Sequence, residues 1–324
     1  MGSRAYFARR LGGALVTLLL VLTFNFFMFR VIGDPVRLLI KSNLRLTPQE
    51  QQALREEFGL AAPLPVQFVG YLGDTFRGEL GQSFTSGKPV TEVIGGRLWP
   101  TVLLVGTGTI LATVLGVLAG IRGAWTRGSA FDRTTLLGSL VLYSVPEGWL
   151  GMILLITFAG SLGWFPVGGY ATTGSEATGF AHVADVAEHL FLPALTLTAA
   201  YVGQYVIIMR SSLMETMGEE FLKVARAKGL TDREVRVRHA VPNALLPTLS
   251  VITLNIGFVL AGSVIVESVF SWPGIGRLVF ESIEELDFPV LQGVFLLLSA
   301  AVIVLNLVAD LLYGVIDPRV RVAA

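Results

Sequence analysis

The chain has 324 residues, with 24 basic and 24 acidic side chains and no cysteine. Hydrophobic residues make up 53% of it and charged residues only 15%, against about 25% charged in soluble proteins. The balanced charge excludes a general attraction to nucleic acid, and the missing cysteines exclude disulfides, thiolate metal sites and cysteine nucleophiles. This composition predicts an all-α polytopic membrane protein embedded in a lipid bilayer.

The first apolar stretch covers residues 11–32 and follows the pair Arg9 and Arg10. A helix of about 20 apolar residues crosses a bilayer. This stretch is too long for a secretory signal, and no small-x-small cleavage pattern follows it. We therefore expect an uncleaved transmembrane anchor after a short cytoplasmic N-terminus, residues 1–10.

The next segment, residues 33–98, is too polar for the bilayer and too long for a simple turn. Thr47-Pro48-Gln49-Glu50 resembles a helix N-terminus with a capping box, and Gly59 offers a C-terminal stop. We expect a small helical insertion on the extracytoplasmic face, with a solvated loop as the alternative.

One part of this insertion superficially resembles a phosphate-binding loop. Five residues rather than four separate Gly81 from Gly87, and Pro89 replaces the serine or threonine after Lys88. No other Walker-like sequence is found in the chain. Nucleotide binding is therefore not expected, and any ATP-derived energy must come from a partner.

Five further apolar stretches are long enough to span a bilayer. We expect these spans at residues 101–121, 134–159, 190–209, 245–266 and 290–315. The segments between the last spans are then a cytoplasmic loop, an outer loop and a cytoplasmic tail, at residues 210–243, 267–289 and 316–324.

The distribution of basic residues predicts the orientation of the six helices, because cytoplasmic loops are enriched in lysine and arginine. A cytoplasmic N-terminus places on that side Arg4, Arg9, Arg10, Arg122, Arg127, Arg133, Arg210, Lys223, Arg226, Lys228, Arg233, Arg236, Arg238, Arg319 and Arg321. The opposite short loops are poor in positive charge. Both termini are thus expected in the cytoplasm.

Polar side chains inside spans either mark a substrate path or join helices by hydrogen bonds. Both interpretations stay open for Asn25, Gln204 and Asn255. Glu147 and Glu267 lie near span ends, where a charge can reach water. These five residues are the candidates for the translocation pathway.

Two other patterns have structural interpretations. Gly116 and Gly120 form a small-xxx-small pair, which favours close contact between membrane helices. A metal site is conceivable in the loop before the fourth span, at His182, Asp185, Glu188 and His189. The histidines are seven residues apart without clear ligand geometry, so we expect no metal.

The cytoplasmic loop contains a short helical pattern from Glu219 to Gly229. Acidic residues begin it, basic residues end it, and the glycine supplies a stop. One face is formed by residues at i, i+3, i+4 and i+7, namely Phe221, Val224, Ala225 and Lys228. The small residues Ala225 and Ala227 suit close approach by another protein. A second helix is expected from Thr231. The pattern favours a docking lever or, equally, an amphipathic helix on anionic lipid.

This loop resembles the cytoplasmic EAA loop of ABC importer permeases. The similarity rests on Ala225-Arg226-Ala227-Lys228-Gly229-Leu230, His239-Ala240 and Asn243-Ala244-Leu245-Leu246-Pro247. It is closest to the dipeptide/oligopeptide/nickel permease family and its first, B-type subunit. Further family-like segments are Tyr6 with Arg9-Arg10-Leu11, Gly33-Asp34-Pro35, Phe270-Ser271-Trp272-Pro273-Gly274-Ile275-Gly276, Asp310-Leu311-Leu312-Tyr313 and Asp317-Pro318-Arg319. Where the general pattern begins with glutamate, this chain has Lys223.

The resemblance implies a type I ABC importer permease in a prokaryotic plasma membrane. It implies a second homologous permease subunit, two cytoplasmic ATPase subunits that bind ATP and magnesium, and an extracytoplasmic substrate-binding protein. The residues it assigns to ATPase coupling are Glu220, Phe221, Leu222, Val224, Ala225, Arg226, Ala227, Lys228 and Gly229. The chain itself is then a non-catalytic subunit without a cofactor.

Peptides are the expected substrate, and nickel, haem and oligosaccharides are the alternatives within the family. Two other classes of membrane protein are alternatives. An ion-driven secondary transporter predicts inverted repeats and buried charged pairs near the midplane. A membrane-embedded hydrolase predicts a polar catalytic pair within the bilayer. Neither feature is clear in the sequence.

Overall fold

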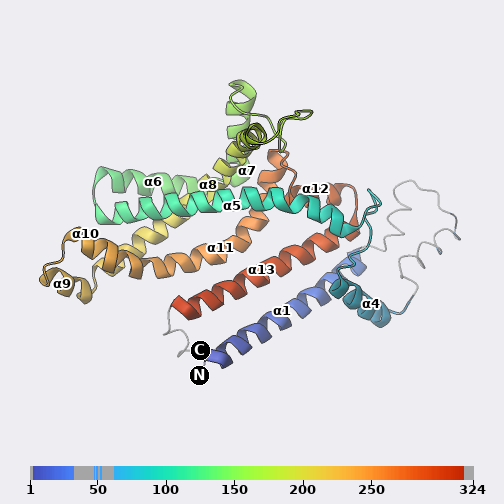
Figure 1. The fold of residues 1–324 in the computed structure, drawn as a ribbon, viewed down its shortest axis with the longest axis horizontal. Helices are drawn as coiled ribbons and strands as arrows, with labels where there is room; N and C mark the ends of the chain where they lie inside the picture. Colours follow the sequence, from blue (N-terminus) through green and yellow to red (C-terminus); the bar gives the residue numbers. More distant parts are fainter. Residues whose placement is uncertain (1–2, 33–46, 48, 50–51, 53–61, 317–324) are drawn as a thin grey trace. The chain divides into compact units, whose positions relative to one another are not determined.

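The computed structural model describes residues 3–32, 47, 49, 52 and 62–316 (Figure 1). Side chains are described for the same residues except 3–7, 31–32, 250, 253–262 and 309–316. Within this part of the chain the regular structure is helical, apart from one isolated bridge between Gln82 and Pro89. The predicted helical class is confirmed. The helix predicted from Thr47 to Gly59 falls mostly outside the described residues.

Several helices are long and apolar enough to cross a membrane. Among the described residues there are four, within Ala8–Arg30, Val90–Trp125, Phe180–Met217 and Phe288–Val308. A bent pair, Ala130–Ser144 with Glu147–Ser161, makes five if it counts as one span. The span predicted at 245–266 lies within helix α11, part of whose side chains are outside the described set.

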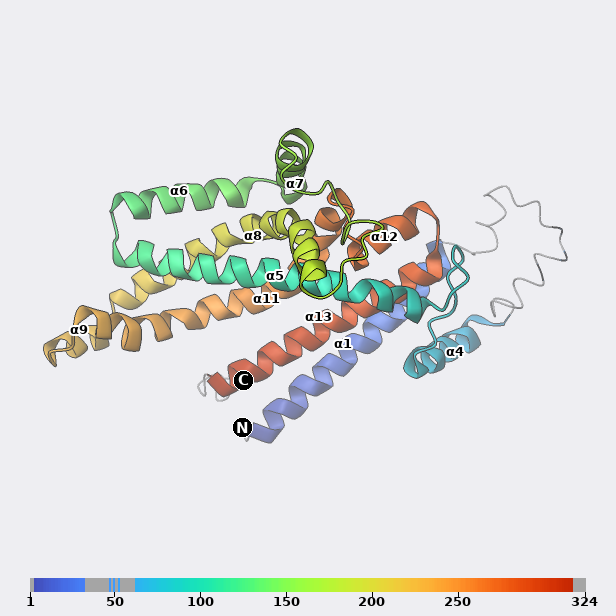
Figure 2. The ribbon, with the colours of Figure 1, turned by 45° about the horizontal axis from the view of Figure 1, so that its top comes forward.

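The chain divides into two compact units, Met1–Leu98 with Leu278–Ala324 and Trp99–Arg277. In unit 1, helices α1 (Ser3–Ile32) and α13 (Phe288–Ile316) pack side by side, and both views show them so (Figures 1 and 2). Phe29 of α1 packs its ring against Phe288 and Phe295. A third helix, α4 (Leu64–Arg77), covers the same end of α1.

Unit 2 is built around α8 (Phe180–Met217), which packs against α6 and α11. In chain order, unit 2 contains most of α5 (Val90–Trp125), then α6 (Ala130–Ser144), α7 (Glu147–Leu154), the π-helical η1 (Leu155–Ser161), α8, α9 (Glu220–Ala227), α10 (Asp232–Glu234), the π-helical η2 (Val235–Ala240) and α11 (Val241–Val269). The final helix before α13, α12 (Ile275–Glu284), begins in unit 2 and ends in unit 1.

Glycines let the helices of unit 2 approach each other closely. A Cβ atom added at Gly116 would lie 2.6 Å from Tyr205 Cβ, and one at Gly120 would lie 2.8 Å from Met209 Cβ. The predicted small-xxx-small contact is therefore confirmed, and its partner is α8. On the other side of α8, a Cβ at Gly203 would collide with the carbonyl oxygen of Ser139 in α6.

The stretch expected to be one span at 134–159 is not a continuous helix. Helix α6 ends at Ser144, and the chain turns by 101° before α7 begins at Glu147. Proline disfavours a helical conformation in the residue before it. Val145, which precedes Pro146, accordingly adopts an extended conformation with φ −86° and ψ 126°. The break is thus encoded locally.

Several helices differ from the expected boundaries. Helix α12 lies in a segment expected to be a loop. Helix α4 lies in the segment expected to be a small helical insertion, and Gly78 in the left-handed conformation supplies a regular stop for it. Helix α5 begins at Val90, eleven residues before the expected span. Helix α8 begins at Phe180, ten residues before the expected span. Hydropathy finds only the part of a helix that lipid surrounds, so polar extensions and amphipathic helices outside the bilayer escape it.

Candidate coupling site at the α9–α10 segment

The short helix α9 (Glu220–Ala227) forms where the sequence predicts it. Glu220 lies in its first turn and Arg226 in its last, as the helix dipole favours. The chain then turns at Gly229, whose φ of +85° is in the left-handed region, and the Gly229 amide donates to the Arg226 carbonyl at 2.9 Å. Both the helix and its glycine stop are confirmed.

A second helical start follows at once. The Thr231 hydroxyl accepts from the Glu234 amide at 3.3 Å, and the Glu234 carboxylate accepts from the Thr231 amide at 3.0 Å. This is a complete capping box. The hydrogen bonds from Thr231 hold the pKa of Glu234 below its ordinary value of 4.5. From there the chain runs through η2 into α11, so the segment is rigidly framed.

One side of α9 is buried against its own chain. Leu222 is fully buried and Ala225 is only 6% exposed. They pack in an apolar cluster with Ala124, Met209, Leu213, Val235, Ala240 and Ala244. The expectation that Ala225 offers its small side chain to another protein is therefore wrong. Its small size instead lets α9 lie close to the ends of α8 and η2.

The other side of α9 is exposed and partly apolar. Phe221 is 40% exposed and Val224 is 53% exposed. With about 100° between successive helical residues, these two and Lys228 share one flank. The other flank of this exposed side carries Lys223, which forms an ion pair with Glu220 at 2.8 Å. The predicted apolar face is thus present, without Ala225.

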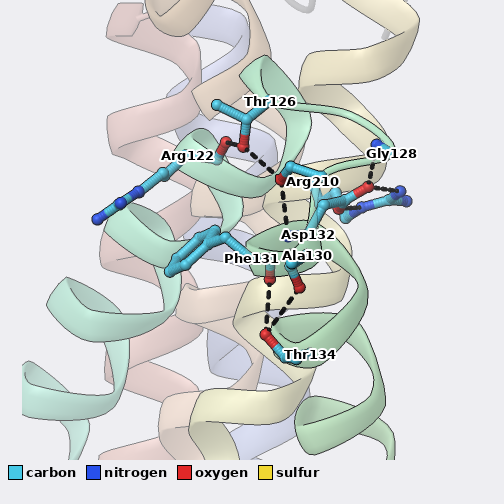
Figure 3. A network of polar contacts seen from close by, with 9 residues as sticks. Arg122, Thr126, Gly128, Ala130, Phe131, Asp132, Thr134 and Arg210 are labelled. Carbon is cyan, nitrogen blue, oxygen red and sulfur yellow. Dashed lines mark hydrogen bonds and ion pairs between the residues drawn. The ribbon is translucent and has the colours of Figure 1, made fainter.

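A buried ion pair fixes the helix that leads into α9 (Figure 3). Arg210 near the end of α8 donates through Nε and Nη2 to Asp132 of α6, at 2.6 Å and 2.9 Å. The Gly128 amide donates to the same carboxylate at 2.9 Å, and the Ser129 hydroxyl caps α6. Such two-pronged pairing is strong and directional. The sequence assigned Arg210 only to the basic loops.

The candidate Glu267 near the end of α11 is fully buried. Its carboxylate accepts from the Thr101 hydroxyl at 2.8 Å and from the Arg277 amide at 3.0 Å. The loop after α11 passes so close that a Cβ at Gly274 would collide with this carboxylate. The indole of Trp272 is also fully buried and donates to the Pro100 carbonyl at 2.9 Å. Glu267 therefore organises its own loop.

The other pathway candidates are placed as follows. Asn25 is buried in unit 1, where its amide donates to the Gln292 carbonyl at 3.2 Å and joins α1 to α13. Gln204 and Glu147 are half-buried in unit 2. The side chain of Asn255 lies outside the described part. A pathway role for these residues stays a prediction.

The loop that resembled a phosphate-binding loop binds a carboxylate of its own chain. The Ser83 hydroxyl donates to Asp287 at 2.5 Å, and the amides of Phe84 and Thr85 donate at 3.1 Å and 3.3 Å. Asp287 precedes α13 and is buried. Phosphate-binding loops also direct successive backbone amides at an anion. The resemblance is therefore explained by the bound carboxylate and requires no nucleotide.

The cluster weighed as a metal site is arranged differently. Asp185 accepts from the amide and hydroxyl of Thr172 at 2.8 Å and 2.7 Å, and His189 Nδ1 lies 2.9 Å from the Asp185 carbonyl. Within the described part of the chain, no group of three or more histidine, aspartate and glutamate side chains is placed to hold a metal ion.

Comparison with known sequences identifies the protein family. The sequence profile described as "Binding-protein-dependent transport system inner membrane component" matches residues 112–322. The chain belongs to this family. A second profile, for the N-terminal part of such membrane components, matches residues 4–105. The protein is therefore a multi-pass permease subunit of a binding-protein-dependent importer, and the family resemblance seen in the sequence is confirmed.

Individual relatives match this permease over nearly its whole length. It is 35% identical to the dipeptide transport system permease protein DppB of Escherichia coli (strain K12), over 98% of each chain. It is 37% identical to the di/tripeptide transport system permease protein DppB of Pseudomonas aeruginosa (strain UCBPP-PA14), again over 98% of each. The glutathione transport system permease protein GsiC of Salmonella choleraesuis (strain SC-B67) is 37% identical, also over 98% of each.

Solved structures support the fold. A chain of the MetNI methionine ABC transporter in an inward-facing conformation aligns with a TM-score of 0.56 at 16% identity. The alignment covers 69% of this permease and 96% of that chain. A second crystal form of the same transporter gives a TM-score of 0.54. The permease therefore shares the helical fold of type I ABC importers.

Proposed function

We propose that this permease imports peptides, as one of two membrane subunits of an ATP-driven importer. Relatives of the same length whose names specify dipeptide, di/tripeptide and glutathione transport support this substrate class. Nickel, haem and oligosaccharide are the alternative substrates. A second homologous permease supplies the other half of the pathway, and an extracytoplasmic binding protein delivers the substrate.

The proposed topology has six spans with both termini in the cytoplasm of a prokaryotic cell. Four long apolar helices and the bent α6–α7–η1 pair account for five spans, and α11 supplies the sixth. The insertion at 33–98 and the loop at 267–289 are extracytoplasmic. Enrichment of lysine and arginine on the α9 side supports this orientation.

The exposed flank of α9 carries the coupling proposal. Phe221 and Val224 present apolar surface on a segment outside the spans, and Leu222 and Ala225 hold that segment rigidly from behind. A rigid helix with an apolar tip can dock in a groove of an ATPase subunit and transmit its movement. ATP and magnesium are bound by two such subunits, and this chain is non-catalytic.

The test is ATP hydrolysis by the complex that co-purifies with tagged permease. Replacing Phe221 and Val224 together by aspartate places charge on the docking flank, so we expect loss of the ATPase subunits and of substrate-stimulated hydrolysis. The matched control is Lys223→Ala on the opposite flank, which leaves both unchanged. Equal activity in the double variant and the control would exclude α9 as the coupling site.

Ala225→Glu is unsuited to this test, because it buries a charge in the apolar cluster and disrupts the fold. The substrate class needs a separate measurement. Uptake of a radiolabelled dipeptide into vesicles that contain the complete importer is expected to depend on ATP and on the binding protein. Absence of this uptake, together with ATP-dependent uptake of nickel, haem or an oligosaccharide by the same vesicles, would replace peptide as the substrate.

A further inference from the structure

A cavity of about 430 Å³ lies between α1 and α13. Both helices belong to unit 1 and lie side by side (Figures 1 and 2). The cavity is near the N-terminal end of α1 and the C-terminal half of α13, where Asn306 contributes to its wall. None of the pathway or coupling residues lines it, so it has no role in the mechanism described above.

One end of the cavity is basic. Arg9 and Arg10 line it at the start of the membrane-crossing stretch Ala8–Arg30. None of the described lining residues is acidic. The side chain of Asp310, one helical turn beyond Asn306, lies outside the described part. The exposed guanidinium group of Arg9, near the amide of Asn306, is suited to a phosphate group. Arg10 interacts within its own chain and adds positive charge to the same wall.

Part of the wall is apolar. Ala14 of α1 and Ile303 and Leu307 of α13 line the cavity together with Thr17 and Asn306. A soluble phosphate would gain nothing from these side chains, whereas a molecule with a charged head and a hydrocarbon tail would contact both parts of the wall. Basic pockets between membrane helices commonly hold the headgroups of anionic lipids.

Gly13 keeps the cavity open. A Cβ atom at Gly13 would meet nothing within 4 Å, in contrast to Gly116 and Gly120, where close helix contact requires glycine. Helix packing therefore does not explain Gly13, although glycine destabilises a helix interior relative to alanine. Thr17, one turn later, donates its hydroxyl to the Gly13 carbonyl at 3.0 Å. That bond satisfies the hydroxyl within its own helix.

We propose that this cavity binds one anionic phospholipid. Arg9 binds the phosphate of the headgroup, Arg10 adds to the positive potential around it, and the first part of an acyl chain lies against Ala14, Ile303 and Leu307. The lipid then joins the N-terminal part of α1 to the C-terminal half of α13, on the side that the topology proposed above makes cytoplasmic. The proposal depends on neither the transported substrate nor the coupling site.

The test uses the complete importer, purified in detergent and stripped of lipid. Native mass spectrometry follows binding of dioleoyl phosphatidylglycerol, with dioleoyl phosphatidylcholine as the neutral comparison. We expect one phosphatidylglycerol to bind with clear preference. Gly13→Leu fills the cavity and abolishes this binding while both arginines remain. Removing both charges, Arg9→Gln with Arg10→Gln, weakens it by about fivefold per arginine, or roughly 25-fold.

Two variants serve as matched controls. Gly12→Leu adds the same side chain where a Cβ also meets nothing within 4 Å, but outside the cavity lining. Arg133→Gln removes an exposed arginine elsewhere on the basic side. Both are expected to bind phosphatidylglycerol as the native complex does. Basal ATP hydrolysis, measured for every variant, confirms that the complex is assembled.

Three results would overturn the proposal. The first is equal phosphatidylglycerol binding by the native complex and Gly13→Leu. The second is displacement of the bound lipid by millimolar inorganic phosphate, which would identify a free-anion site. The third is binding only after removal of the second permease subunit, which would show that a protein occupies the cavity. Arg9 and Arg10 also contribute to the predicted orientation of the protein in the membrane. Gly13→Leu keeps both arginines, so loss of lipid binding in this variant would not result from an altered orientation.

Discussion

Two buried carboxylates of unit 2 are held in different ways. Asp132 meets a guanidinium group, with Arg210 donating two hydrogen bonds to it. Glu267 meets neutral donors, the Thr101 hydroxyl and the backbone amide of Arg277 in the first turn of α12. The first arrangement depends on opposite charge, and the second depends on a loop that fits closely around the carboxylate.

This difference matches the position of each group. Arg210 lies in the last turns of α8, directly before α9, so the ion pair fixes the root of the proposed coupling segment. Glu267 lies at the end of α11, where the following loop folds back over it. Breaking a buried ion pair leaves an uncompensated charge, whereas disturbing a close-packed loop costs the energy of overpacking. Two substitutions test the comparison, and a titration extends it to an exposed carboxylate.

The largest effect is expected from Asp132→Ala. This change leaves the partly buried Arg210 without its carboxylate and should lower the free energy of unfolding by about 3 kcal/mol. The thermal midpoint of the purified complex should fall by on the order of 5 °C. Adding Arg210→Met removes the orphaned charge and should restore part of the loss. A midpoint that stays at the native value in the single variant would contradict the charge-based account.

A smaller effect is expected from Gly274→Ala. The added methyl group would collide with the Glu267 carboxylate and the Thr101 hydroxyl, at a cost of about 2 kcal/mol. Gly138→Ala is the matched control, because a Cβ there meets nothing within 4 Å. Alanine in that helix should stabilise by up to about 1 kcal/mol. Equal midpoints for the two variants would show that the loop does not fit tightly.

The smallest effect concerns an exposed carboxylate, Glu234, in the capping box of α10. Hydrogen bonds from Thr231 lower its pKa below 4.5 in the folded protein. Its contribution to stability is therefore complete above pH 4.5 and is lost as the pH falls through the folded-state pKa. Hydrogen exchange of residues 231–235 should speed up, after correction for intrinsic rates, over that range. Glu234→Gln retains a capping residue, and persistence of the pH effect in it would assign the titration elsewhere.

Features that depend on neighbouring residues were predictable from the sequence. The start and stop of α9 and the second helical start at Thr231 involve groups within about one helical turn. The break at Pro146 has an equally local cause, but the apolar run through it led to the expectation of one continuous span. The family resemblance also followed from residues in order along the chain. In each case the physical cause is local, so the sequence displays it directly.

Which side of α9 faces its own chain was decided only by the tertiary structure. Helical periodicity placed Phe221, Val224 and Ala225 on one face, but it could not show that Ala225 packs with Leu222 against α8 and η2. The sequence also does not show which residue pairs with a buried polar side chain. Arg210 pairs with Asp132 across 78 positions and Glu267 pairs with Thr101 across 166.

Apolar length and ordered motifs are properties of the linear chain, so they already identify a helical membrane protein of the importer permease family. The tertiary structure decided which glycines carry contacts and which leave space. Gly116 and Gly13 are both glycines within helices, yet Gly116 lies against α8 and Gly13 lines a cavity. That difference exists only once helices distant in the sequence have packed together.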